Sequence, residues 1–167
     1  MHVKAVKFSP NGKYLAYGNE AGNVIIWDVE IDEQVQPKLA GFRAPVTDIE
    51  FSPDNRLLVV TSRNRQVRVW DMDNLYDLPI VLRDYTGQSA GTGWVYDADF
   101  SPDGKYFVTA AGDGAIRRYP TNIAEMADLI CENIKSGQGN MSDNEWRQYV
   151  GEGISYEFTC EGQAKRE

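Results

Sequence analysis

One short pattern occurs three times in this chain, and its spacing limits what the chain can fold into. The pattern is Phe-Ser-Pro followed by Asn or Asp, and it occupies residues 8–13, 51–56 and 100–105. Nineteen residues after each Phe stands an aromatic residue, and these are Trp27, Trp70 and Tyr119. The repeats are 43 and then 49 residues apart. Self-similarity at such a period indicates stacked supersecondary units rather than an irregular globular chain.

Each repeat reads as three antiparallel strands joined by tight turns. Pro10, Asn11 and Gly12 suit the first turn, because Pro presets φ and both Asn and Gly tolerate positive φ. The predicted strands are 3–8, 14–18 and 24–28, then 46–51, 57–61 and 66–71, then 94–100, 106–111 and 115–119. Apolar residues of each first strand are spaced by three and then by two, as in Val3, Val6 and Phe8. A regular strand has a period of two, so we predict a β-bulge near the start of each first strand.

The fourth strands are marked more weakly. We predict one at 37–41 and one at 80–83, and the sequence marks none after Tyr119. A period of about 40–45 residues that ends in Trp-Asp is typical of four-stranded β-propeller blades. Residues 1–120 are therefore predicted to be all-β, as a partial β-propeller of three four-stranded antiparallel blades. The approximate bounds of the blades are 1–41, 42–84 and 85–120.

Residues 121–167 have a different pattern, which predicts a small helical C-terminal extension. Asn122 and Glu125 are spaced like a capping box, and apolar residues then recur at helical spacing. A second capping box at 142–145 precedes a shorter predicted helix. Residues 154–160 alternate in polarity, which is typical of a strand.

Charge and composition argue against several classes of partner. The net charge is −8, and an acidic chain repels phosphate backbones, so we expect no nucleic-acid partner. No apolar run reaches the roughly 18 residues that a membrane span needs, so we expect no membrane partner. Cys131 and Cys160 are too few for a disulfide framework and fit a reducing, cytoplasmic location.

The three repeats resemble the WD-repeat β-propeller family over residues 2–120, in the Phe-Ser-Pro-Asp-Gly turn and in the Trp-Asp at a fixed distance. Residues 121–160 resemble an extension that follows the last blade in large bacterial WD-repeat signalling proteins. The matching residues of the extension are Cys131, Glu145-Trp146-Arg147-Gln148-Tyr149, Tyr156 and Thr159-Cys160. The resemblance implies a module of a larger bacterial protein that binds a protein partner.

Members of this family often carry a His ahead of each blade, which joins an Asp, a Ser or Thr, and the Trp in a hydrogen-bond network. Here Phe42 stands in place of that His. Asp113 matches the network Asp, whereas Ala21 and Asn64 replace it in the other repeats. No repeat has the full network, so we expect apolar packing and the turns to hold the blades together.

The number of blades leaves a question of closure. Propellers close with about 4–8 blades, so three leave two blade faces uncovered. The expected cover is the remaining blades in cis, in a longer chain, or a second copy in trans. Met1 lies directly before a predicted strand, which favours the first of these.

The sequence offers no catalytic, cofactor or metal site. His2 is the single histidine, and one histidine supports neither a triad nor a zinc cluster. Acidic pairs at Asp48 and Glu50 and at Asp97 and Asp99 are interpreted as channel-lining residues or partners of cations such as Lys7. We therefore expect that the chain is not an enzyme and needs no cofactor.

The resemblance places partner contacts at the propeller rim, just before each first strand and in each second hairpin. The matching positions are His2, Glu20, Arg43, Pro45, Arg63, Trp94 and Gly112. Trp and Arg are enriched at interface hot spots. The alternative, in which Trp94 fills the core and the arginines are merely solvated, stays open at this point.

These observations predict a non-catalytic protein-interaction, scaffold or sensor module that forms the C-terminal part of a larger WD-repeat signalling protein. A different class of function is also open: a self-assembling structural unit in which two chains complete a closed propeller. The sequence does not identify the partner.

Overall fold

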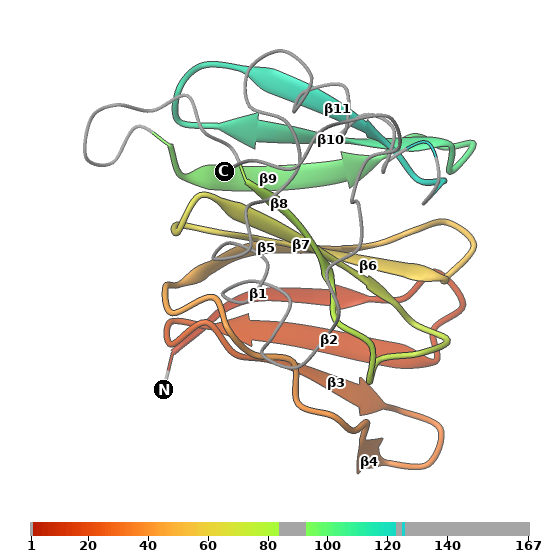
Figure 1. Ribbon diagram of the computed structural model, residues 1–167. Coiled ribbons are helices and arrows are strands. Elements are labelled where there is room, and N and C mark those ends of the chain that lie inside the picture. The colour runs from red at the N-terminus through yellow and green to blue at the C-terminus, as the bar shows by residue number, and fades with distance from the viewer. Residues whose placement is uncertain (1, 84–92, 123–124, 126–167) are drawn as a thin grey trace, which may run out of the picture. The chain divides into compact units, whose positions relative to one another are not determined.

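The computed structural model describes residues 2–83, 93–122 and 125. The chain divides into two compact units, Met1–Tyr119 and Pro120–Glu167. Three antiparallel sheets build the described part of the first unit, each drawn from one stretch of the chain (Figure 1). The fold of this unit therefore follows the three sequence repeats.

Each sheet is a meander in which neighbouring strands are neighbours in the sequence. The orders are β1-β2-β3-β4, β5-β6-β7-β8 and, among the described residues, β9-β10-β11. The bounds in the first sheet are β1 Val3–Phe8, β2 Tyr14–Asn19, β3 Val24–Asp28 and β4 Glu33–Gln34. Those in the second are β5 Val46–Phe51, β6 Leu57–Ser62, β7 Gln66–Asp71 and β8 Ile80–Arg83. Those in the third are β9 Val95–Phe100, β10 Tyr106–Ala111 and β11 Ile116–Pro120.

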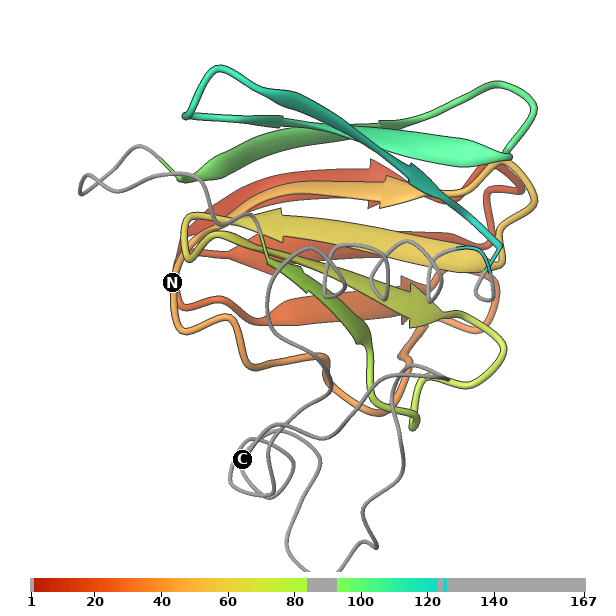
Figure 2. The same ribbon diagram turned by 45° about the horizontal axis from the view of Figure 1, so that its top comes forward.

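The first strands bring the three sheets together. Strand β5 contacts β1 on one side and β9 on the other, and the second strands make the further contacts β2 with β5 and β6 with β9. Figure 1 shows the sheets as successive layers in chain order, whereas the strands of the first and second sheets overlap in the view of Figure 2. Contacts between layers that are concentrated on first and second strands are what blades radiating from a shared centre produce.

The predicted β-bulges are confirmed in all three sheets. Register shifts show one unpaired residue in each first strand, namely Lys4, Thr47 and Tyr96. The extra residue explains the three-then-two spacing of the apolar side chains, because it restores the strand's inward face after the bulge. The limits of the three principal strands of each repeat also agree with the prediction to within one residue.

The repeated turn forms because its Ser side chain satisfies both sides of the loop. Ser52 donates a hydrogen bond to Asp54 at 2.5 Å and accepts one from the Leu57 backbone N–H at 2.8 Å. Ser9 and Ser101 make the same pair of contacts in the other repeats. The hydrogen bond from Ser52 lowers the pKa of the Asp54 carboxyl. Polar closure of this kind explains why the pattern recurs so closely in the sequence.

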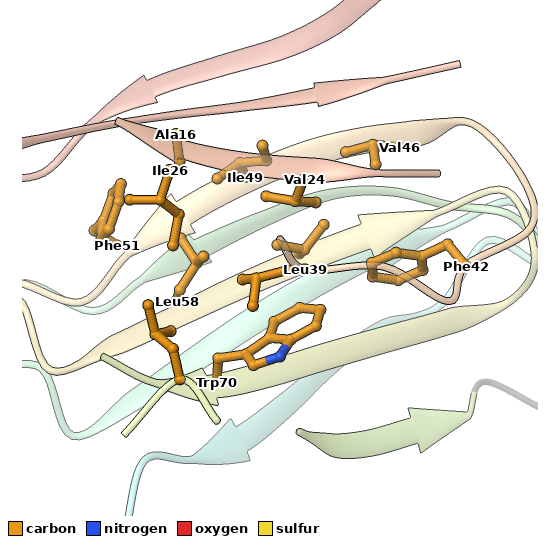
Figure 3. Close-up of a cluster of buried hydrophobic side chains, with 12 residues drawn as sticks. Ala16, Val24, Ile26, Leu39, Phe42, Val46, Ile49, Phe51, Leu58 and Trp70 are labelled. Carbon is orange, nitrogen blue, oxygen red and sulfur yellow. The ribbon is translucent and has the colours of Figure 1, made fainter. Parts of the chain in front are cut away.

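Apolar side chains of the first two sheets interlock in a single core (Figure 3). The first sheet and the segment after it contribute Ala16, Val24, Ile26 and Leu39, and the second sheet contributes Val46, Ile49, Phe51, Leu58, Val60 and Trp70. Phe42 and Leu75 join the core from flanking segments. All are buried, so the expectation that apolar packing joins the blades is confirmed for this pair of sheets.

The fourth strands depart from the prediction in two of the three sheets. In the first sheet the fourth strand is Glu33–Gln34, and the predicted segment 37–41 contributes only an isolated bridge between Leu39 and Val24. Pro37 has no N–H to donate to a ladder, which limits this segment. The third sheet has three strands among the described residues, which agrees with the lack of a marked strand after Tyr119, whereas the predicted class of a four-stranded blade is not met within them. Pro120 again ends the regular pairing.

The predicted helical extension lies almost entirely outside the described residues. Its first capping contact is described: the Glu125 backbone N–H donates to Asn122 Oδ1 at 3.3 Å. This is the contact that a capping box predicts. The helix after it, the second capping box at 142–145 and the strand predicted at 154–160 are not described.

Acidic side chains gather on the first strands, where the three sheets meet. Glu50 on β5 accepts a hydrogen bond from the Lys7 ammonium on β1 at 2.5 Å, which confirms the predicted cation partner. Asp48 accepts one from the Ala98 backbone N–H on β9 at 3.1 Å. Burial raises the pKa of the Asp48 carboxyl, and burial also raises the pKa of Glu50 despite the attraction of Lys7. Within the described ranges, no group of acidic, His or Cys side chains is suited to hold a metal ion.

Replacing Asp48 with asparagine is expected to stabilise the protein at neutral pH. Because the folded-state pKa is raised, the folded chain binds more protons than the unfolded chain in the window between the ordinary and the raised value. Stability therefore falls as pH rises through that window, and the ionised form is the less stable one. The asparagine side chain would keep an acceptor for the Ala98 N–H without the buried charge.

The measurement is the urea midpoint of wild type and Asp48→Asn at neutral and at weakly acidic pH. The advantage of the variant should shrink as the pH falls. Asp73→Asn is the matched control, because the Asp73 side chain is exposed on the β7–β8 connection. A variant that is less stable than wild type at neutral pH would contradict the assignment of a destabilising charge.

Candidate interaction site

Three backbone hydrogen bonds join the residues that the sequence places at the rim. Glu20 N–H donates to His2 O at 3.0 Å, Arg63 N–H to Pro45 O at 3.1 Å, and Gly112 N–H to Trp94 O at 2.8 Å. Each bond ties the residue before a first strand to the hairpin between the second and third strands. We call the set His2, Glu20, Arg43, Pro45, Arg63, Trp94 and Gly112 the rim. The structure therefore brings the predicted residues together as one pair in each sheet, with Arg43 two residues before Pro45.

Trp94 links the second and third sheets at the rim. The Arg63 guanidinium lies over its ring at 4.8 Å from the centroid, and Tyr96 meets it edge-on at 6.4 Å. Trp94 is half-buried, whereas Arg63 is exposed. One region of the Trp94 side chain therefore packs between two sheets and another remains accessible, so its role as a contact residue stays a prediction.

The loop before β5 links the first and second sheets. A Cβ at Gly22 would lie 2.6 Å from Ala44 O and 3.0 Å from the Arg43 backbone N, so this loop packs directly on the β2–β3 hairpin. Asn64 donates a hydrogen bond to Phe42 O from the other side. The backbone at Arg43 is therefore held by both neighbouring hairpins while its side chain stays exposed.

Arg65 is a functional candidate that the sequence reasoning missed. It has φ of +66°, and the equivalent residues of the other two hairpins are Gly22 and Gly114, both at +81°. Its side chain lies across Gly93, where a Cβ would come within 2.7 Å of Arg65 Nε. A left-handed backbone costs an L-residue about 1–2 kcal/mol, so glycine suits this position better. The three-repeat alignment alone, with Gly in two copies and Arg in the third, would have shown the anomaly.

Replacing Arg65 with glycine is expected to raise the free energy of unfolding by about 0.5–1 kcal/mol, because it relieves the left-handed strain. Urea denaturation followed by circular dichroism measures this. Gly22→Ala is the reverse control, since it adds a Cβ at positive φ against Ala44 O, and it should destabilise the chain. A clear loss of stability in Arg65→Gly would show instead that its side-chain contacts outweigh the strain.

Other contacts stand in each sheet where WD-repeat proteins often have the hydrogen-bond network of His, Asp, Ser or Thr, and Trp. In the second sheet Phe42 packs on Trp70, with ring centroids 6.0 Å apart, and the Arg68 guanidinium lies 4.9 Å from the centroid of the Phe42 ring. In the third sheet Asp113 binds Arg117 at 2.5 Å, and Tyr119 stacks on Phe107 at 5.2 Å. In the first sheet the Trp27 indole N–H donates to Asp32 at 3.1 Å. Aromatic packing, an ion pair and a single indole hydrogen bond thus occupy the places of the network in the three sheets.

A second surface of interest lies on β1. The apolar residues of β1 that follow the three-then-two spacing are Val3, Val6 and Phe8, and they are 56%, 63% and 59% exposed. The equivalent residues of β5 and β9 are buried against the preceding sheet, and these are Val46, Ile49, Phe51, Val95, Ala98 and Phe100. We call Val3, Val6 and Phe8 the open face. The open face carries the same kind of apolar residues that β5 and β9 bury, but among the described residues no sheet covers it.

In the part of the chain that the structure describes, no helix has the length and apolarity that a membrane crossing requires. On the first strands Glu50 pairs with Lys7 and Asp48 with a backbone N–H. Within the same described residues, no group of acidic, His or Cys side chains is suited to hold a metal ion. What the arrangement offers chemically is a surface of guanidinium and aromatic groups.

Stacked antiparallel meanders, two of four strands and one of three described strands, with bulged first strands define a partial β-propeller. Residues 1–84 match the family model described as the Nucleolar protein 10-like, N-terminal domain, a β-propeller, and residues 81–119 match the model described as WD domain, G-beta repeat. The chain belongs to the WD-repeat β-propeller family. A crystal structure of the Cps50 (Swd1) β-propeller domain of Myceliophteria thermophila has the same fold, with a TM-score of 0.61 and 24% identity over 72% of this chain and 36% of that chain.

Curated relatives share the sequence over most of the chain. Protein LST8 homolog of Drosophila melanogaster is 34% identical over 134 residues, which is 78% of this chain and 42% of that protein. Protein groucho of the same fly is 27% identical over 71% of this chain and 15% of its own length. Protein HIR1 of Kluyveromyces lactis is 30% identical over 70% of this chain and 14% of its own length. The chain spans less than half the length of each of these relatives.

Proposed function

We propose that this chain is a non-catalytic protein-interaction module, a scaffold or sensor, whose rim contacts a protein partner. The observation that carries the proposal is the rim itself. Backbone hydrogen bonds fix one pair of rim residues in each sheet, while the Arg43 and Arg63 side chains are exposed and Trp94 is half-buried. A rigid backbone that presents Trp and Arg is the arrangement found at interface hot spots.

We further propose that the module works within a larger, cytoplasmic WD-repeat signalling protein. Two observations support this. The matched relatives are more than twice as long as the segment they share with this chain, and the open face has the residues of a blade contact. The bacterial origin implied by the C-terminal extension stays a prediction, because the relatives named above come from a fly and a yeast.

Site-specific photocrosslinking in the host cells tests the rim as the contact surface. A photoreactive residue replaces Arg43 in one version of the full chain and Lys105, in the Ser-Pro turn of the third repeat, in a matched control. We expect discrete crosslinked protein species from position 43 and none from position 105. Crosslinks from position 105 alone would overturn the assignment of the rim.

The open face favours a second candidate function, a self-assembling structural unit. Val3, Val6 and Phe8 expose apolar surface where the second and third sheets bury theirs. A second copy could cover this face and complete a closed ring of blades. This candidate predicts a defined oligomer of the chain by itself, which analytical ultracentrifugation of the purified chain tests.

A further inference from the structure

The rim of the second sheet differs in charge from the rest of the molecule. The net charge of the chain is −8. The segments 40–45, 62–66 and 93–94, which contain the rim residues Arg43, Pro45, Arg63 and Trp94, carry three arginines and no acidic residue. They lie next to one another, because Arg63 N–H bonds Pro45 O and the Arg63 guanidinium covers Trp94. A local basic surface on an acidic protein is a candidate for charge-selective binding.

Arg63 combines an exposed side chain with a fixed neighbour. Its guanidinium carbon lies 4.8 Å from the centroid of the Trp94 ring, and the residue is exposed. A guanidinium carries five N–H donors, and a contact with an aromatic ring occupies none of them as a conventional hydrogen bond. Holding the side chain on the ring also lowers the entropy that a ligand must remove on binding. Arg63 is therefore suited to the two-pronged contact that arginine makes with a carboxylate.

Arg43 supplies a second cation of the same kind. Its backbone is fixed between the Gly22 hairpin and Pro45, with φ of +54°, and its side chain is exposed. The acidic residues of the neighbouring hairpins already face cations of their own sheets, Glu20 with Lys4 at 3.7 Å and Asp113 with Arg117 at 2.5 Å. Both acids are therefore paired with cations other than Arg43 and Arg63.

We propose that Arg43, Arg63 and Trp94 bind an acidic, extended segment of a protein partner, with its carboxylates on the two guanidinium groups and an adjacent side chain against Trp94. This inference rests on the proposed function and adds the chemical class of the partner. Carboxylates match the arginine geometry, and the half-buried indole provides the apolar anchor that a peptide side chain needs.

A protein segment fits these observations better than a nucleic acid. A nucleic acid presents one phosphate after another, and the chain's charge of −8 opposes its approach outside this short surface. An extended peptide of a few residues requires only the local basic surface. Its carboxylates would be steered to that surface by the local positive field, while the rest of the chain repels a longer polyanion.

Fluorescence anisotropy with a short labelled peptide rich in Asp and Glu and containing one Leu tests the proposal on the full 167-residue chain. The peptide with Asn and Gln in place of the acids is the matched probe, and a single-stranded DNA oligonucleotide is the other arm. We expect the acidic peptide to bind at low ionic strength, to weaken as salt rises, and to bind more tightly than either other probe.

Charge-reversal variants locate the site. Arg63→Glu and Arg43→Glu are each expected to weaken binding of the acidic peptide about tenfold or more, and Trp94→Leu to weaken it less. Arg56→Glu makes the same change of charge at the Ser-Pro turn of the second repeat and should stay within about twofold of wild type. Both rim arginines are exposed, so folding should persist in each variant, and circular dichroism checks this.

Three outcomes would overturn the proposal. These are equal effects of Arg56→Glu and Arg63→Glu, equal binding of the acidic and amide peptides, and tighter binding of the oligonucleotide. Such results leave the proposed function intact if position 43 still crosslinks a partner in cells, because the rim would then bind a partner of different chemistry. Loss of the crosslinks as well would remove both.

Discussion

Replacing Phe42 with alanine is expected to lower the free energy of unfolding by about 3–5 kcal/mol, the usual cost of deleting a buried aromatic ring. Phe42 is 1% exposed and belongs to the core between the first two sheets. Its ring contacts Trp70, and the Arg68 guanidinium covers it. Removing it therefore opens a cavity at the point where the rim joins the core. Since a domain is stable by about 5–15 kcal/mol, this one change removes much of the total.

Urea denaturation followed by circular dichroism measures the loss for Phe42→Ala. Tyr76→Ala is the control, because Tyr76 is also aromatic but is 77% exposed on the β7–β8 connection. The control should stay within about 0.5 kcal/mol of wild type. If Phe42→Ala lost no more than the control, Phe42 could not be the residue that replaces the missing network.

Phe42 also marks the limit of what the sequence could predict. The sequence shows that Phe42 stands where WD-repeat proteins often have a histidine, and the loss of that hydrogen-bonding residue suggests a less stable blade. The structure shows a compensation, because the ring joins the core and Asn64 still donates to the backbone of residue 42. Packing of this kind depends on Trp70 and Arg68, which lie far along the chain, so no local pattern could reveal it.

Local patterns did predict the strands and bulges well. Ser-Pro turns fix where each hairpin reverses, and the three-then-two spacing of Val46, Ile49 and Phe51 requires one extra residue in the strand. The fourth strands were less predictable, because pairing at an outer edge requires few apolar residues. Glu33–Gln34 pairs through its backbone next to β3 without any hydrophobic signal. The two residues pair because the turn after β3 brings the chain back beside that strand.

The rim also combines features that depend on neighbouring residues with features that depend on distant ones. The predicted rim residues were placed by their positions just before a first strand or in a second hairpin, and a backbone hydrogen bond joins one such pair in each sheet. The contact of Arg63 with Trp94 crosses two sheets, so only the assembled fold could show it. Arg65 was overlooked although Gly22 and Gly114 stand at its position in the other repeats. Comparing the chain's repeats residue by residue therefore gives more than matching the motif alone.

Replacing Val6 with aspartate is expected to abolish self-association of the purified 167-residue chain. Val6 is 63% exposed on the open face, whereas its equivalents Ile49 and Ala98 are 1% and 4% exposed against a neighbouring sheet. Burying one such aliphatic side chain contributes about 1.5–3 kcal/mol, and three adjacent apolar side chains make a strong drive to find a covering surface. A carboxylate in that contact would be buried without a partner, which costs more than the apolar gain.

Analytical ultracentrifugation over a range of concentrations measures the effect. Wild type should show masses above that of one chain as concentration rises, and Val6→Asp should remain a single chain. Leu78→Asp is the control, because Leu78 is 82% exposed on the β7–β8 connection, away from the open face, and it should behave as wild type. Wild type that stays a single chain throughout, or a Val6→Asp variant that still associates, would contradict the role of the open face.

The form of the association separates the two proposed functions. Two copies that close a ring cover every exposed blade face, so growth stops at a dimer of fixed mass. An open face that is shaped for a blade of a longer chain does not close a ring with a second copy. Each contact then leaves another face exposed, so further copies add and the mass keeps rising with concentration. A discrete dimer lost in Val6→Asp therefore favours the self-assembling unit. A continuing series lost in the same variant favours a module that the remaining blades of a larger protein complete.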